Sequence, residues 1–257
     1  MKVRDVKEHS PSRMSDSVRS IVYALVIAVI IRSLLFQPFN IPSGSMEPTL
    51  LIGDYLFVSK FSYGYTHYSF PLSPPVFSGR IFPSQPNRGD IVVFRLPRDD
   101  SIDYVKRVIG VPGDRIQVKN GTVHINDTPV VRQQIADFIG EDPCGGRRDF
   151  NSEVRVRQWQ ETLPNGVSYH TLQCTTFEGF PDTTKVYKVP PGNYFMMGDN
   201  RENSEDSRFP DVGFVPFENV IGRAQIIFFS LAGGDPAWQI WRWPWSVRLN
   251  RLFKIVR

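Results

Sequence analysis

The stretch from residue 90 to residue 126 reads DIVVFRLPRDDSIDYVKRVIGVPGDRIQVKNGTVHIN, and it decides the fold class. Its β-branched runs at 90–96 and 104–110 are separated by a charged turn, a pattern typical of two consecutive strands. Asn120-Gly121 separates two further runs, and Asn-Gly in that position is the strongest short signal for a β-hairpin. This stretch predicts a mostly β, antiparallel fold.

The sequence on either side extends the same pattern. Four further strands are expected, at 50–61, 186–189, 193–197 and 224–230. Residues 65–87 are rich in proline and aromatic residues and predict a long exposed loop, whereas the polar region at about 121–190 predicts a β-rich insertion. The expected architecture is therefore a folded-over or barrel-like antiparallel β-sheet assembly.

Composition excludes several classes of protein. The 257 residues carry a net charge of only +4, with much of the excess at the two ends, and show no Walker A loop, zinc-finger spacing or basic patch with stacking aromatics. We therefore expect no nucleic-acid partner. The two cysteines, Cys144 and Cys174, lie in no CxxC motif and next to no histidine, which argues against a metal site. In an oxidising compartment a disulfide between them is favoured, the alternative being two unpaired buried thiols.

An apolar segment near the N-terminus decides the topology. Residues 21–31 (IVYALVIAVII) are unbroken but too short to span a bilayer, a length that also fits a signal-peptide core or a buried helix. Extension from Val18 to Phe36 gives nineteen residues, or about 28 Å of helix, against a hydrocarbon core of about 30 Å. Because no small-x-small cleavage site follows, the sequence predicts an uncleaved single-pass anchor at 18–36, after a polar tail at 1–17.

Flanking charge predicts the orientation of this anchor. Five lysine and arginine residues stand at or before residue 19, whereas none occurs between Arg32 and Lys60. The positive-inside rule then places the N-terminus in the cytoplasm and residues 37–257 outside it.

The C-terminal segment WQIWRWPWSVRLNRLFKIVR combines four tryptophans with five basic residues, Arg251 among them. This composition suits a membrane interface, where indole rings lie at headgroup level and cations meet anionic lipid. The alternative is that the tryptophans pack on the core.

Three stretches carry unusual polar residues: 41–50 (IPSGSMEPTL), 103–114 (DYVKRVIGVPGD) and 198–208 (GDNRENSEDSR). A serine hydroxyl in the first needs a base to remove its proton during attack. Of the four histidines, His9 precedes the apolar segment and the other three stand next to no acidic residue, so nothing local supports a Ser-His-Asp triad, although triads assemble in space. Taken alone, the first stretch reads as a turn and the third as a solvated loop held by surface ion pairs.

Lys106, in the second stretch, shares a predicted strand face with Tyr104 and Val108, so that face is apolar apart from the ammonium. Burial lowers the pKa of a lysine, and a change from about 10.4 to about 8 costs about 3 kcal/mol. A neutral lysine at working pH is what a general base requires. The alternative is a strand-edge lysine with its head in water. Arg107, on the opposite face, is expected to reach solvent.

Together these stretches carry a family resemblance. The boxes SGSMEPTL, RGDIVVF, DYVKRVIGVPGD and GDNRENSEDSR occur in this order behind an apolar segment, and over residues 18–230 the chain closely resembles the bacterial type I signal peptidases, or leader peptidases. The resemblance implies a membrane-bound serine endopeptidase that removes N-terminal signal peptides from exported preproteins after small-x-small sites such as Ala-x-Ala. It also implies a β-rich catalytic domain at 37–257 that needs no metal or cofactor.

The resemblance further implies where the enzyme works. Its setting would be the bacterial inner membrane, with the catalytic domain in the periplasm. Its partners would be preprotein signal peptides and membrane lipid, in the vicinity of the secretion translocon.

The resemblance also assigns roles to residues. Ser45 resembles the nucleophile and Lys106 the general base, while Ser43 resembles the oxyanion-hole hydroxyl and Ser204 the hydroxyl that orients the base. Support of the site would come from Asp199, Asp206 and Arg208. A substrate strand would lie between 39–43 and 103–105, against binding residues Phe39, Ile41, Leu56, Val93, Asp103 and Val105.

Two other functions are alternatives to this one. The first is a Ser-Lys autoprotease like the SOS-response repressors, which carry a DNA-binding module where this chain has its apolar segment. The second is a membrane-bound peptide-binding protein without activity. The joint presence of Ser43, Ser45, Lys106 and Ser204 speaks against the second.

Overall fold

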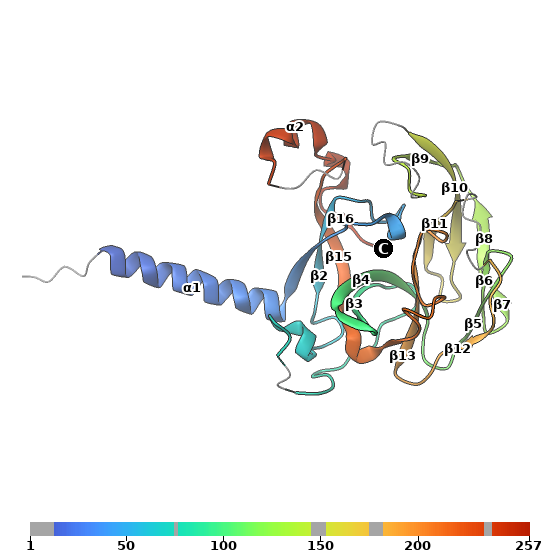
Figure 1. Ribbon diagram of the computed structural model, residues 1–257, viewed down its shortest axis with the longest axis horizontal. Coiled ribbons are helices and arrows are strands. Elements are labelled where there is room, and N and C mark those ends of the chain that lie inside the picture. Colours follow the sequence, from blue (N-terminus) through green and yellow to red (C-terminus); the bar gives the residue numbers. More distant parts are fainter. Residues whose placement is uncertain (1–12, 75–76, 145–152, 175–181, 234–237) are drawn as a thin grey trace, which may run out of the picture.

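The computed structural model describes residues 13–74, 77–144, 153–174, 182–233 and 238–257. A single long helix, α1 (Arg13–Leu34), projects away from a body made of β-strands (Figure 1). Over Asp16–Leu34 it has a mean hydropathy of 1.8 and only 6% of its residues are buried, so it is long and apolar enough to cross a membrane. The helix ends two residues before the predicted limit of 36, because Phe36 begins the first strand and packs against Phe57 and Phe61.

The largest sheet has eight strands in the order β1-β2-β15-β3-β4-β13-β14, with β16 also paired to β15. Its strands are β1 (Phe36–Asn40), β2 (Asp54–Ser59), β3 (Ile91–Leu96), β4 (Asp99–Gly110), β13 (Asn193–Met197), β14 (Val215–Pro216), β15 (Val220–Ser230) and β16 (Lys254–Ile255). All its pairings are antiparallel. The mostly β, antiparallel prediction is confirmed.

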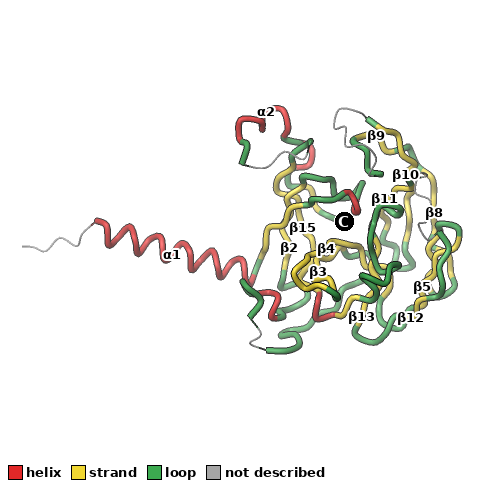
Figure 2. Tube along the Cα trace, viewed as in Figure 1, coloured by secondary structure: helices red, strands yellow, loops and turns green. Residues whose placement is uncertain are grey.

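Two four-stranded sheets make up the other side of the body (Figure 2). One contains β5 (Arg115–Lys119), β6 (Thr122–Ile125), β7 (Thr128–Pro129) and β12 (Tyr187–Lys188). The other contains β8 (Val131–Gln134), β9 (Phe138–Gly140), β10 (Val154–Thr162) and β11 (Ser168–Gln173). The predicted hairpin lies in the first of them: β5 pairs with β6, and Asn120 and Gly121 both take positive φ, as a tight hairpin turn requires.

One predicted turn is wrong. The charged residues at 99–103 belong to β4, where Asp103 pairs with Arg95 of β3, so the turn between β3 and β4 is confined to Pro97-Arg98. The side chains at 99–103 are largely exposed, and an exposed strand end tolerates charge. The disulfide between Cys144 and Cys174 is present, in preference to two free thiols.

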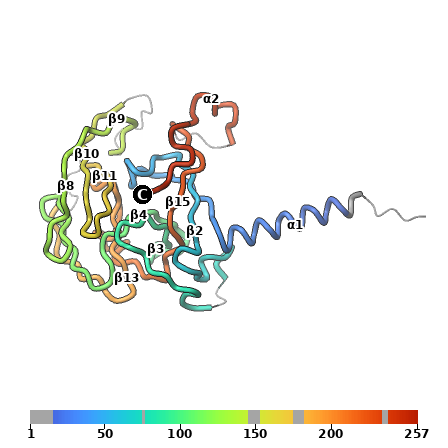
Figure 3. Tube along the Cα trace, turned by 180° about the vertical axis from the view of Figure 1, so that it is seen from behind, coloured from blue at the N-terminus to red at the C-terminus, as the bar shows by residue number. Residues whose placement is uncertain are grey.

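The C-terminal segment lies on the surface, beside β15. It contains the short helix α2 (Trp243–Ser246), which both views of the trace place next to the end of β15 (Figures 1 and 3). The alternative that the tryptophans pack on the core is wrong for Trp238, Trp241 and Trp245, whose side chains are mainly exposed. Arg251 in contrast is buried, where its guanidinium binds Asp54.

An aromatic row connects the end of α1 with this C-terminal segment. Neighbouring ring centroids along it lie between 4.2 and 6.2 Å apart. The row consists of Phe61, Phe36, Phe57, Phe228, Tyr55, Phe229 and Trp243. It crosses β1, β2 and β15, so one face of the largest sheet is lined with half-exposed aromatic rings.

Candidate active site

Ser45 and Lys106 meet at the surface of the largest sheet. Ser45 lies in a single 3₁₀ turn, Gly44–Met46, and Lys106 lies in β4. The turn is anchored from below, because Met46 and Leu50 are buried in the core cluster under β1 and β2. Lys106 Nζ is 2.6 Å from Ser45 Oγ, in a hydrogen bond between residues 61 positions apart in the sequence. A potential nucleophile and a potential base are therefore in direct contact.

The surroundings of Lys106 favour its neutral form. Its side chain is only 4% exposed, and burial lowers its pKa to about 8, although the nearby carboxylates of Asp206 and Glu205 act in the opposite direction. The Tyr104 ring lies beneath the ammonium, with 5.1 Å between Nζ and the ring centroid. A lysine with this pKa is partly deprotonated near neutral pH and can accept a proton.

Ser43 stands beside the nucleophile on the open side of the site. Its Oγ lies 3.5 Å from Ser45 Oγ, longer than an ordinary O–H···O hydrogen bond, and its side chain is exposed to the cleft. The hydroxyl therefore has room to donate to another acceptor.

Ser204 lies on the buried side of the same site. Its side chain is 1% exposed and, within the described residues, its hydroxyl has no hydrogen-bond partner. Gly198 makes the close packing here possible: a Cβ at that position would lie 2.2 Å from Ser204 Oγ and 2.5 Å from the Ser45 carbonyl oxygen. The hydroxyl is thus packed against Gly198, whose other neighbour is the Ser45 carbonyl, and it keeps its bonding capacity.

A buried ion pair lies behind the site. Asp199 accepts hydrogen bonds from Arg107 Nε and Nη2 at 2.8 and 2.7 Å, and another from Thr49 Oγ1 at 2.5 Å. The expectation that Arg107 reaches solvent is therefore wrong, since its side chain is fully buried. Its carboxylate partner comes from a stretch 92 residues away, and together they join the loop of Ser45 to the strand of Lys106.

A second buried pair shapes the stretch at 198–208. Asp206 accepts from Arg208 Nε and Nη2, both at 2.8 Å, and from the backbone N–H of Gly198 at 3.0 Å. Burial disfavours the charged carboxylate, but Arg208 and these hydrogen bonds outweigh it and hold the pKa of Asp206 below its ordinary value. The alternative of a solvated loop with surface pairs is wrong, because both side chains are buried.

A cleft of about 510 Å³ opens beside Ser45 and Lys106. Four of the six predicted binding residues line it: Phe39, Ile41, Asp103 and Val105. Leu56 and Val93 do not, since both are fully buried in the core cluster beneath the cleft. Their side chains support its floor.

Sequence reasoning missed other residues that line the cleft. Met46, Ile102, Tyr104, Asn203 and Glu205 all belong to it, and Tyr104 Oη donates to Glu205 Oε2 at 3.0 Å. Four of the five lie within the three polar stretches of the sequence, and that position was the signal that could have identified them as cleft residues.

Asn200 was also missed, although it holds the loop that carries Ser45. Its backbone N–H donates to the Ser45 carbonyl at 3.2 Å, and its side-chain amide donates to the carbonyls of Gly44 at 3.1 Å and Pro143 at 2.6 Å. Pro143 precedes the disulfide-bonded Cys144, so Asn200 links that loop to the disulfide.

The chain is similar in sequence to known peptidases. The chain matches the family described as "Signal peptidase, peptidase S26" over residues 14–229. It is 42% identical over 258 residues to the Signal peptidase I of Rickettsia typhi, covering 91% of each chain. It is 39% identical over 270 residues to that of Rickettsia conorii, covering 99% of this chain and 97% of the other. A crystal structure of a signal peptidase I from Enterococcus faecalis V583 matches at 24% identity with a TM-score of 0.31, over 55% of this chain and 97% of that one.

Proposed function

Because this chain belongs to the signal peptidase family, peptidase S26, and is a serine endopeptidase, we propose that it cleaves signal peptides from exported preproteins with Ser45 as nucleophile and Lys106 as base. The family resemblance drawn from the sequence is confirmed by these matches. The observation that carries the proposed mechanism is the 2.6 Å contact between Lys106 Nζ and Ser45 Oγ, formed by a lysine that is almost fully buried.

The first half of the reaction forms an acyl-enzyme. Neutral Lys106 takes the proton of the Ser45 hydroxyl as Ser45 Oγ attacks the scissile carbonyl carbon. The negative charge that develops on the carbonyl oxygen is stabilised by the Ser45 backbone N–H and the Ser43 hydroxyl, which reaches into the cleft. Lys106, now charged, then gives its proton to the leaving amine, and the C–N bond breaks.

The second half releases the signal peptide. A water molecule loses a proton to neutral Lys106 and attacks the ester carbon. The tetrahedral intermediate then collapses as the bond from carbon to Ser45 Oγ breaks and Lys106 gives its proton to Ser45 Oγ, which frees the acid and restores the dyad. Ser204 acts as a positioning residue in both halves, since its unpartnered hydroxyl is packed beside the dyad and can accept or donate one hydrogen bond to the lysine. No step requires a metal or cofactor.

The substrate binds as an additional strand between β1 and β4. β1 is an edge strand, because among the described strands its one neighbour is β2. Both β1 and β4 line the cleft. β4 pairs with β3 along 103–107, while its pairing with β13 starts at Arg107, so the other side of 103–106 is open to a further strand. Backbone hydrogen bonds to both edges would supply affinity, and the apolar wall at Phe39, Ile41 and Val105 would accept small side chains such as alanine.

The enzyme is anchored in the membrane by α1, with its N-terminus in the cytoplasm and its catalytic domain in the periplasm. The exposed apolar surface of α1 and the basic residues before it support this orientation. The aromatic row continues from the end of α1 to the exposed tryptophans of the C-terminal segment, so this face is suited to the bilayer interface.

The proposal is tested by cleavage of a preprotein with an Ala-x-Ala site by the full chain in detergent micelles. We expect Ser45→Ala and Lys106→Met to fold and to release no mature protein, whereas Lys119→Met, which changes an exposed lysine, retains wild-type activity. Thermal unfolding of each variant controls for loss of the fold. Wild-type turnover by either dyad variant would remove that residue from the mechanism.

A further inference from the structure

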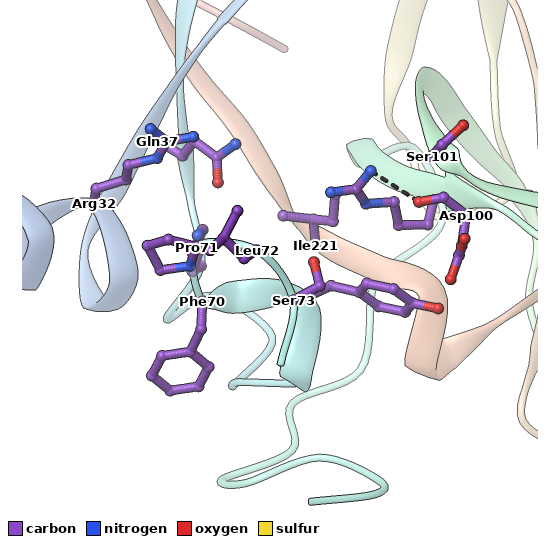
Figure 4. A pocket seen from close by; sticks show the side chains of 12 residues that line it. Arg32, Gln37, Phe70, Pro71, Leu72, Ser73, Asp100, Ser101 and Ile221 are labelled. Atoms are coloured by element: carbon purple, nitrogen blue, oxygen red, sulfur yellow. Dashed lines mark hydrogen bonds between the residues drawn. The ribbon is translucent and has the colours of Figure 1, made fainter. Parts of the chain in front are cut away.

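A second hollow, of about 470 Å³, lies where α1 joins the body (Figure 4). It shares no lining residue with the catalytic cleft. Arg32 and Gln37 lie on the side of α1 and β1, and Asp100 and Ser101 lie across from them on β4. The mechanism proposed above uses none of these residues.

The hollow is rich in positive charge that the protein itself does not neutralise. Arg32, Lys60 and Arg95 line it, against a single carboxylate, Asp100. Arg95 is paired with Asp103 at 3.1 Å, but among the described residues neither Arg32 nor Lys60 forms an ion pair. Two cations therefore face the hollow without a carboxylate of their own.

Lys60 is the unusual member of this group. It is 1% exposed, and the protein gives its ammonium one hydrogen bond, to the carbonyl oxygen of Ser69, although an ammonium carries three donors. Burial, followed by the charge of Arg32, lowers its pKa to about 8, so the protein alone stabilises the charged form poorly. An anion in the hollow would supply the missing acceptors and raise the pKa of Lys60.

The hollow lies at the end of α1, where the surface of a lipid bilayer is expected. Arg32 stands in the last turn of α1, the segment that crosses the bilayer in the proposed function. Leu72, on the rim, has a fully exposed side chain and a φ of 62°, a left-handed conformation that a leucine rarely adopts. Leu35 and Phe36, which follow α1, are exposed as well. Apolar side chains on the rim and cations inside match the boundary between acyl chains and headgroups.

From this arrangement we propose that Arg32 and Lys60, with Arg95 beside them, bind the phosphate of a membrane phospholipid headgroup where α1 leaves the bilayer. Guanidinium and ammonium groups are the standard donors to phosphate, and Arg32 can offer two parallel N–H bonds. Gln37, whose amide lies beside Arg32, can donate a further bond. The lipid tails would pass over Leu72 into the membrane. This inference rests on the membrane anchoring proposed above but not on the catalytic roles.

The test is binding of phosphatidylglycerol to the full chain in detergent micelles, measured by native mass spectrometry without any peptide substrate. We expect one tightly held lipid on the wild-type chain and about a tenfold weaker affinity for Arg32→Gln, the loss of one charge-assisted contact. Arg98→Gln, which removes an exposed arginine outside the hollow, should bind as the wild type does. Equal affinity in the Arg32 and Arg98 variants would overturn the proposal.

Two further measurements distinguish lipid binding from binding of free phosphate and from loss of the fold. Inorganic phosphate at millimolar concentration should not displace the lipid, because it lacks the acyl chains; displacement would make the hollow a site for free phosphate and overturn the lipid assignment. Lys60→Met should weaken binding at least as much as Arg32→Gln, and its unfolding temperature shows whether it folds. Because Arg32 is exposed, its variant decides the matter if Lys60→Met unfolds.

Flotation with vesicles tests the anchor by itself. Wild type and Arg32→Gln should both float, since α1 is intact in each. A chain that does not float would contradict the anchor and overturn the lipid assignment that rests on it.

Discussion

Asp199 binds Arg107 at two points, at 2.8 and 2.7 Å, in a site from which water is excluded, and Arg107 is the neighbour of Lys106 in β4. The same carboxylate accepts a hydrogen bond from Thr49, four residues after Ser45. The pair therefore joins the two segments that carry the proposed dyad. Burial disfavours the charged guanidinium, but Asp199 outweighs this effect and raises the pKa of Arg107, so the guanidinium stays charged.

Asp199→Asn should lower the free energy of unfolding by about 3–5 kcal/mol, because it leaves the buried charge of Arg107 without its counter-charge. Chemical denaturation measures this change. The matched control is Asp211→Asn, which breaks the exposed pair of Asp211 with Arg98 and should cost less than about 1 kcal/mol. Equal losses in the two variants would mean that the buried pair has no special role.

The rate constant kcat/KM should rise with pH through an apparent pKa near 8, as Lys106 loses its proton. Glu205→Gln should move this rise to lower pH by less than about one unit, because the carboxylate of Glu205 raises the pKa of Lys106 and its removal lowers it. Glutamine can still accept the hydrogen bond from Tyr104. A pH profile that is unchanged in this variant, or that moves to higher pH, would contradict the assignment of the alkaline limb to Lys106.

Ser204→Ala should reduce kcat by roughly tenfold to a hundredfold, through misplacement of Lys106, with little change in stability. Stability should be spared because, among the described residues, the Ser204 hydroxyl has no partner to lose. Ser207 provides the reverse control: its hydroxyl accepts a hydrogen bond from the Met196 backbone N–H at 2.9 Å. Ser207→Ala should therefore lower stability by about 1–3 kcal/mol and affect kcat less. Kinetics and thermal unfolding of both variants decide between these roles.

Replacement of both Cys144 and Cys174 by alanine should destabilise the enzyme by about 3 kcal/mol, the typical effect of a cross-link that closes a loop of this size, here 30 residues. We also expect a lower kcat, because Asn200 holds the Gly44 carbonyl and the Pro143 carbonyl together. Unfolding temperature and turnover, each with and without reductant, test this link. Reductant should weaken the wild type and leave the variant unchanged; full turnover by the variant would show that the nucleophile loop does not depend on the disulfide.

Local patterns in the sequence predicted the strands well. The Asn120-Gly121 hairpin follows directly from turn chemistry, and the aromatic and apolar run at 193–197 forms β13 with the predicted limits. The apolar residues on both sides of Lys106 raised the possibility of a buried amine, with a strand-edge lysine in water as the alternative, and the side chain is buried. Each of these features depends on residues within a few positions of one another, which is the range over which a sequence pattern carries information.

The errors concern residues whose environment comes from elsewhere in the chain. Arg107 was expected to reach solvent because it lies on the strand face opposite Lys106. That face is covered instead, and Asp199 reaches Arg107 through the pairing of β4 with β13. Leu56 and Val93 look like pocket residues by position, yet the pairing of β15 with β2 and with β3 directs both into the core. The contacts of Asn200 depend likewise on a close approach of three separate segments.

A single residue, Leu35, joins the end of α1 to the beginning of β1, and only nine positions separate Phe36 from Ser45. A fully extended chain covers at most about 3.6 Å per residue, so Ser45, eleven positions after Leu34, stands no more than roughly 40 Å from the end of α1. This short connection limits the distance between Ser45 and the end of α1. With α1 anchored in the bilayer as proposed, a peptide bond within this distance of the membrane can reach Ser45, whereas the same motif farther along an exported polypeptide cannot, however well it fits the cleft.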